Sequence, residues 1–186
     1  MYTKEKLVPG GILEPVTGKA FIFYTDSNKT SDFMVDGLLL WWNENKDKQH
    51  FSTVTNLVVN MDNGPECSGR SSQFLLRMAE FADMTQLTVR LTYYPPYHSK
   101  YNAIELYWAG LEKSWNGYLL DTSIAVLNRT SNFVWKGFRA TVNLMSSVYE
   151  KGVKLCGKEK AALEQRLQRS SKLSLYDILI QPKTVN

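Results

Sequence analysis

The stretch LTVRLTYYPPYHSKYNAIELYW, residues 87–108, runs from a predicted strand to a predicted helix through a loop with two prolines. Aromatic and β-branched side chains in its first eight residues favour a strand. Pro95 and Pro96 end that strand, because proline cannot donate to a β-ladder. Apolar side chains then recur at helical spacing over residues 102–115. The stretch therefore predicts a strand, a loop and a helix whose first turn carries Glu105.

Glu105 has two readings at this stage. The order Asn102-Ala103-Ile104-Glu105 fits an N-cap followed by three helical positions, so Glu105 could close a capping box onto Asn102. The same carboxylate could instead bind a metal ion at the end of the preceding strand. The local sequence favours the capping role.

A second acid follows another predicted strand. Residues 53–61, TVTNLVVNM, contain a continuous rather than alternating apolar run, which predicts a central strand buried on both faces. The strand ends in DNGPE (62–66), a composition typical of a turn. Asp62 is therefore either a turn residue or a carboxylate that projects from the end of a strand.

The rest of the chain alternates between predicted strands and helices. This alternation predicts an α/β layer with an at least partly parallel sheet. Residues 8–15 read as a turn-rich lead-in, and residues 135–156 show no clear pattern. The other predicted elements are a strand at 19–26, helices at 31–44, 71–84, 122–133 and 159–168, and an extended tail at 173–180.

Right-handed crossovers would bring the ends of strands 53–61 and 87–94 to the same edge of the sheet, where open α/β sheets place their chemistry. Asp62 and Glu105 would then lie within reach of one divalent cation. Mg²⁺ binds through one or two carboxylates and completes its shell with water and phosphate oxygens. The pair of acids therefore strengthens the metal-binding reading of each.

Composition limits the function classes. The chain of 186 residues is 44% hydrophobic and 22% charged, as in an ordinary globular domain. Its two cysteines form no CxxC pair, and no apolar run is long enough to span a bilayer. Residues 1–99 hold nine Lys and Arg against eleven acids, whereas residues 100–186 hold thirteen against seven. The basic second half is compatible with a polyanionic partner, although solvated surface charge is the commoner explanation.

Four blocks of the sequence resemble the catalytic core of DDE-type insertion-sequence transposases, specifically the ISAzo-like group with the Rhodopirellula-type DDE domain. This resemblance implies an α/β, ribonuclease H-like fold of the retroviral integrase superfamily, with a mixed sheet flanked by helices. It also implies a core at 1–135 and a C-terminal extension at 136–186. Asp62 is similar to the second acid of the DDE triad and Glu105 to the third. The blocks are VVNMDNGPE (58–66), YYPPYHSKYNAIELYWAGLEKSWNG (93–117), YTDSNKTSDFMVDGLLLWW (24–42) and WKG (135–137).

The chain departs from the family pattern in two places. Ala103 stands where the family usually has proline at the first helical position, a change that helix propensity tolerates. The strand at 19–26 resembles the third of the family's first three strands, so we expect the first two strands and the first Asp of the triad to be absent. Asp26 would lie about 10 Å from the required position, two strands away. We therefore expect the chain to be the C-terminal part of a transposase and to be inactive in isolation.

The resemblance implies metal-dependent DNA cleavage and strand transfer at transposon ends with Mg²⁺ or Mn²⁺. It implies DNA as partner, a possible homo-oligomer, no membrane, no small-molecule cofactor, and a place in the bacterial cytoplasm with the nucleoid. The alternatives are a non-catalytic remnant with at most non-specific DNA binding, a different nuclease on the same fold, or a small α/β binding module. Further candidate residues, each with a structural alternative, are Asn63 and His98 near the metal, and Arg70, Lys100, Lys113, Tyr97 and Tyr101 as DNA contacts.

Overall fold

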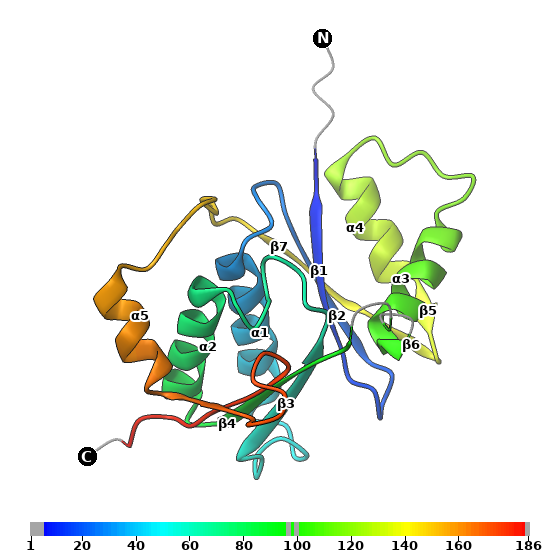
Figure 1. Ribbon diagram of the computed structural model, residues 1–186. Coiled ribbons are helices and arrows are strands. Elements are labelled where there is room, and N and C mark those ends of the chain that lie inside the picture. Colours follow the sequence, from blue (N-terminus) through cyan, green and yellow to red (C-terminus); the bar gives the residue numbers. More distant parts are fainter. Residues whose placement is uncertain (1–5, 96–97, 99–100, 185–186) are drawn as a thin grey trace. The chain divides into compact units, whose positions relative to one another are not determined.

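The computed structural model describes residues 6–95, 98 and 101–184 of the chain (Figure 1). The chain forms two compact units, each assembled from two separate stretches. The first unit comprises Met1–Lys29 with Ala103–Tyr149, and the second comprises Thr30–Asn102 with Glu150–Asn186. Within the described part of the chain, no helix is long and apolar enough to cross a membrane.

The first unit is built on a three-stranded mixed sheet. Strand β1 (Val8–Leu13) pairs antiparallel with β2 (Ala20–Thr25), and β2 pairs parallel with β7 (Thr141–Met145), in blue and yellow in Figure 1. Helices α3 (Ala103–Ser114) and α4 (Ser123–Asn132) contact β1 and β7 respectively.

Aromatic and aliphatic side chains fill the core of this unit. Ile22 from β2 and Leu111 from α3 are fully buried, together with Tyr107. Trp108 and Trp115, predicted to lie on the inner face of the helix, are partly buried against this core. A short hairpin follows α4, formed by β5 (Val134–Trp135) and β6 (Phe138–Arg139).

The prediction that residues 8–15 form a turn-rich lead-in is wrong, because residues 8–13 form β1. Pro9 and two glycines suggested a turn, but β1 is an edge strand, where proline is tolerated. A Cβ at Gly10 would lie 2.3 Å from the Phe23 ring, so the glycine lets β1 lie close to the aromatic side chains of β2. One strand therefore precedes residues 19–26, and the expected absence of the family's first two strands and of the first Asp of the triad stays a prediction.

The second unit contains a four-stranded mixed sheet in the order β3-β4-β9-β8. Strand β3 (Asn56–Met61) runs parallel to β4 (Thr88–Tyr93), and both β4 and β8 pair antiparallel with β9. The parallel β3–β4 pair confirms that the two strands end at the same edge. The other elements are α1 (Ser31–Asn45), α2 (Ser72–Thr85), α5 (Gly157–Glu164), β8 (Leu167–Arg169) and β9 (Asp177–Ile180).

The helices of this unit follow the predicted patterns closely. The side chains of Thr30 and Ser71 cap α1 and α2 by accepting hydrogen bonds from backbone N–H groups three residues later. An apolar stripe of α2 is buried, and Trp41 and Trp42 of α1 are also buried. The stripe consists of Phe74, Leu75, Met78, Phe81 and Ala82.

The prediction that strand 53–61 is central and buried on both faces is wrong. β3 lies at the edge of its sheet, and its side chains alternate between exposed and half-buried. Val58, in the middle of the apolar run, is 56% exposed. Three consecutive apolar residues between two asparagines do not distinguish a central strand from an edge strand, because alternation sends every second side chain to the other face.

The C-terminal part of the chain contributes to both units. Residues 135–156, which lacked a clear pattern, supply β6 and β7, and the predicted extended tail supplies β9. The charged helix predicted at 159–168 ends at Glu164, and a strand follows it. The boundary between a core at 1–135 and an extension at 136–186 stays a prediction.

Candidate functional site

Asp62 directly follows the last residue of β3, at the edge where the parallel strands β3 and β4 both end. The register pairs Met61 with Tyr93, and the Tyr94 N–H donates to the Met61 carbonyl at 3.0 Å. The half-buried Asp62 side chain is held by one polar neighbour, because Asn102 Nδ2 donates to its Oδ1 at 3.1 Å. Within the described residues, no hydrogen bond to its Oδ2 is formed.

The loop that follows Asp62 is closed by its own polar groups. Asn63 Oδ1 accepts from the Gly69 N–H at 3.3 Å, and Cys67 Sγ donates to the Asp62 carbonyl at 3.3 Å. The Cys67 N–H donates to the Gly64 carbonyl at 3.2 Å. The Asn63 side chain therefore makes a contact that closes the turn, as expected if its role is structural. Its predicted role near a metal stays a prediction.

Residues distant in sequence hold this loop from outside. Ser31 Oγ donates to the Glu66 carbonyl at 2.7 Å, and Arg169 Nη1 donates to the Gly69 carbonyl at 3.1 Å. A Cβ at Gly69 would lie 2.2 Å from the Leu175 carbonyl oxygen, so only glycine permits this backbone approach. The loop is therefore held at Glu66, near its middle, and at Gly69, near its end.

Arg169 is itself held in place by a carboxylate. Its Nε and Nη2 donate to both oxygens of Glu164 at 2.9 and 2.7 Å, and Nη1 also donates to the Ser174 carbonyl at 3.0 Å. These bonds raise the pKa of Arg169, and they lower the pKa of Glu164. The bidentate pair fixes the plane of the guanidinium, which orients its remaining N–H groups toward the loop.

Sequence reasoning missed the roles of Asn102 and Arg169. Asn102 was visible as the candidate N-cap, and its amide was a clear donor, but its partner is 40 residues away. Arg169 lies 100 residues from Gly69 and carried no local signal that could have revealed the contact.

Tyr93, the last residue of β4, is a further buried group of the second unit. Its hydroxyl has no hydrogen-bond partner within the described residues, and burial is the main cause that raises its pKa. The phenol therefore stays protonated at neutral pH and offers a donor rather than a negative charge.

Glu105 lies in the first turn of α3 and is exposed. It belongs to the first unit, whereas Asp62 and Asn102 belong to the second. The predicted capping box and the predicted metal-binding role of Glu105 both stay predictions.

The remaining predicted residues are exposed where they are described. The His98 ring stacks on the Tyr101 ring with centroids 5.8 Å apart and planes inclined by 24°. Tyr101 is 64% exposed, and Arg70 and Lys113 are also exposed. Tyr97 and Lys100 lie outside the described residues.

The donors around Asp62 fit a hard cation in kind. A carboxylate oxygen is the ligand that Mg²⁺ and Mn²⁺ prefer, and the nearby thiol of Cys67 is engaged with a backbone carbonyl. Across residues 6–95, 98 and 101–184, no three His, Cys, Asp or Glu side chains form a group that could hold a metal ion. The predicted metal-binding role of Asp62 stays a prediction.

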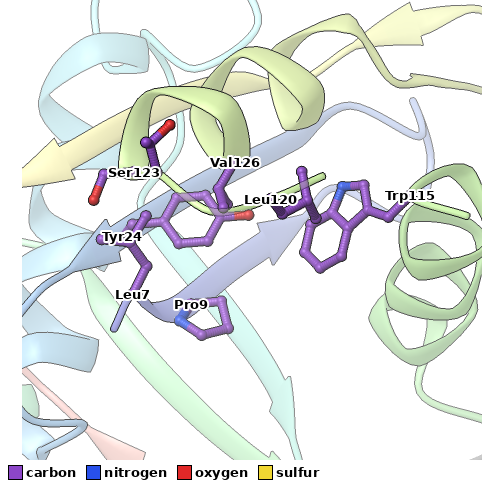
Figure 2. Close-up of a pocket in the computed structure, with 8 residues that line it drawn as sticks. Leu7, Pro9, Tyr24, Trp115, Leu120, Ser123 and Val126 are labelled. Atoms are coloured by element: carbon purple, nitrogen blue, oxygen red, sulfur yellow. The ribbon is translucent and has the colours of Figure 1, made fainter. Parts of the chain in front are cut away.

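The first unit also contains an apolar cavity of about 280 Å³ (Figure 2). None of the predicted site residues lines it. The Tyr24 hydroxyl at its wall forms a 2.8 Å hydrogen bond with Thr130 Oγ1, which satisfies the polar end of the ring. The lining residues are Leu7, Pro9, Tyr24, Trp115, Leu120, Thr122, Ser123 and Val126.

A mixed α/β fold with an acid at the shared end of two parallel strands is consistent with a DDE transposase domain. The chain belongs to the Rhodopirellula transposase DDE domain family, whose sequence model matches residues 1–182. Comparisons with curated proteins and with solved structures gave no match. The family assignment confirms the resemblance carried by the four sequence blocks, and the ribonuclease H-like arrangement stays a prediction.

Proposed function

We propose that this chain supplies two of the metal-binding acids, Asp62 and Glu105, with which a DDE transposase cleaves DNA at transposon ends and joins it to a target. In the first step, water attacks a phosphodiester and releases a 3′-hydroxyl. In the second step, that hydroxyl attacks a phosphodiester of the target DNA and displaces its 3′-oxygen. Both steps are phosphoryl transfers with an oxygen nucleophile and an oxygen leaving group.

The hydrogen bond from Asn102 to Asp62 is the observation that best supports this proposal. It fastens the residue before α3 to the acid at the end of β3. Glu105 follows Asn102 by three positions in the sequence, which limits their Cα–Cα distance to about 11 Å. Covalent geometry therefore limits how far Glu105 can lie from Asn102.

The residues of the chain have distinct parts in this proposal. Asn102 orients the Asp62 carboxylate and leaves Oδ2 for a ligand, while Arg169 and Gly69 hold the loop that carries it. When bound, Mg²⁺ or Mn²⁺ supplies the positive charge that stabilises the attacking and leaving oxygens of an in-line displacement. Exposed basic side chains such as Arg70 and Lys113 position phosphates without reading sequence.

Calorimetric titration with Mn²⁺ tests the two acids separately. We expect Asp62→Asn and Glu105→Gln each to weaken Mn²⁺ binding by about tenfold or more, since changes outside the ligand shell already cost 10–100-fold. Asp26→Asn at the end of β2 and Glu112→Gln in α3 are the matched controls, because both remove an exposed acid from the same kind of element. Unchanged binding in either test variant refutes its role as a ligand.

A nicking assay on supercoiled DNA tests the chemistry. We expect the 186-residue chain alone to be inactive with Mg²⁺ or Mn²⁺, because the family's triad requires a third acid besides Asp62 and Glu105. A reconstruction that adds this acid should nick DNA, and its Glu105→Gln variant should not. Strong metal-dependent nicking by the chain alone would show that another of its acids completes the site.

A further inference from the structure

Two neighbouring turns of the first unit present cations and an aromatic ring. The β5–β6 hairpin turns through Lys136 and Gly137, whose φ angles of 48° and 86° are those of a tight hairpin turn with two left-handed residues. A Cβ at Gly18, in the turn between β1 and β2, would lie 3.0 Å from Lys136 Cδ. The two turns are therefore packed together.

The turn between β1 and β2 is held by its own hydrogen bonds. The Glu14 N–H donates to the Lys19 carbonyl at 2.9 Å, and the Gly18 N–H donates to the Glu14 carbonyl at 2.8 Å. The Glu14 carboxylate accepts from Thr17 Oγ1 at 2.9 Å. The acid of this turn is thus engaged inside the turn, and the Lys19 side chain is presented outward.

Phe138 is the aromatic residue at this place. It pairs across the hairpin with Trp135, whose ring packs against the fully buried Tyr107 with centroids 5.8 Å apart. Trp135 therefore anchors the hairpin, while Phe138 at the rim is 43% exposed. Lys19 Nζ lies 5.7 Å from the centroid of the Phe138 ring.

Three cations belong to the hairpin and the neighbouring turn. Lys19, Lys136 and Arg139 are exposed, and none of the three forms an ion pair with any described residue. Arg139 pairs with Val134, so it projects from the opposite face of the hairpin to Phe138. A ligand bound around the hairpin would therefore contact Lys19 beside Phe138, Arg139 on the opposite face and Lys136 at the turn.

We propose that this basic tip, composed of Lys19, Lys136, Phe138 and Arg139, is a DNA-binding element. The cations would contact phosphates, and Phe138 would stack on an unpaired base, since every base offers a π-face. The proposal takes DNA as the partner from the proposed function, and it requires neither Asp62 nor Glu105.

Binding of fluorescent DNA, measured by anisotropy in EDTA at several salt concentrations, tests the basic tip. The probes are a duplex of about 20 base pairs and oligothymidine of about 20 nucleotides. We expect the triple variant Lys19→Gln, Lys136→Gln, Arg139→Gln to lower the salt slope on duplex by about 2.7, which weakens binding up to about 500-fold at 0.1 M salt. We expect Phe138→Ala to weaken binding to oligothymidine by about 5- to 150-fold and to leave the duplex unaffected.

Two further variants distinguish a binding effect of the basic tip from effects of net charge and of misfolding. Changing Lys151, Lys154 and Lys158 to Gln removes the same charge from exposed positions of the second unit and should preserve the salt slope. Exchanging Lys for Arg and Arg for Lys at the tip should retain binding.

Equal losses in the two Gln triples, or none in the tip triple, overturn the phosphate contacts. An unchanged affinity of Phe138→Ala for oligothymidine, or an equal loss on duplex, overturns the stacking role. EDTA removes divalent metal, so these results do not depend on cleavage.

Discussion

Gly69→Ala should destabilise the second unit, because Gly69 lies where the Asp62 loop meets the C-terminal segment. The added Cβ would lie 2.2 Å from the Leu175 carbonyl oxygen and 3.1 Å from its carbon. Real Cβ atoms do not approach backbone this closely, so one segment must shift by about 1 Å. The shift would also strain the bond from Arg169 to the Gly69 carbonyl.

The expected cost follows from the backbone nature of the clash. Overpacking in a well-packed region costs about 1–3 kcal/mol, and backbone cannot rotate away as a flexible side chain can. We therefore expect Gly69→Ala to lower the free energy of unfolding by about 2 kcal/mol. For a chain of this size, that corresponds to a melting temperature lower by about 4–8 °C.

Thermal unfolding followed by circular dichroism measures this effect against two other glycines. A Cβ at Gly64, in the same loop, meets only ordinary contacts at 3.7 and 3.8 Å, so Gly64→Ala should change stability by less than about 0.5 kcal/mol. Gly157 opens α5 with no atom within 4 Å, so Gly157→Ala should stabilise by about 0.4–1 kcal/mol. A Gly69→Ala variant that melts at or above the wild-type temperature would refute the close approach to Leu175.

Three further predictions concern the same loop. Asn102→Asp replaces the donor to Asp62 with a second carboxylate. Without Mn²⁺ and at neutral pH, this variant should therefore be less stable than the Asn102→Ala variant, and melting curves would compare the two. The lowered pKa of Glu164 means that its ion pair stabilises the fold above about pH 4.5 and that this contribution is lost as pH falls through the folded pKa; the melting temperatures of wild type and Glu164→Gln should therefore converge at acidic pH. Arg169→Gln loses the bond to the Gly69 carbonyl, so its free energy of unfolding in a denaturant titration should be lower by about 2 kcal/mol. An unchanged midpoint would contradict the role of Arg169 in holding the loop.

The elements that could be predicted from sequence are those whose pattern is local. The apolar residues of α2 from Phe74 to Ala82 repeat at a fixed spacing, so the helix predicted at 71–84 is confirmed. The parallel ends of β3 and β4 followed from the alternation of strands and helices. The elements that could not be predicted depend on distant neighbours. β1 pairs with β2 with Gly10 opposite the Phe23 ring, and no other described strand pairs with the outer side of β3.

The same distinction holds for the candidate site. Asp62 was predicted from its place after a strand, and the family assignment confirms the class of protein. Its supports were not identifiable, because Asn102 and Asp62 are 40 residues apart and Arg169 and Gly69 are 100 residues apart. Hydrogen bonds of this kind leave no periodicity in the sequence.

These distant supports link the acid to the end of the chain. β9 lies between β4 and β8, and its Ile178 and Ile180 are fully buried. The same C-terminal stretch supplies Arg169 and the Leu175 carbonyl, which fix Gly69 and with it the loop of Asp62. Because the loop has little secondary structure of its own, its conformation depends on these contacts and on its internal hydrogen bonds. The geometry of the proposed metal ligand is therefore determined as much by residues 164–180 as by the motif that identifies it.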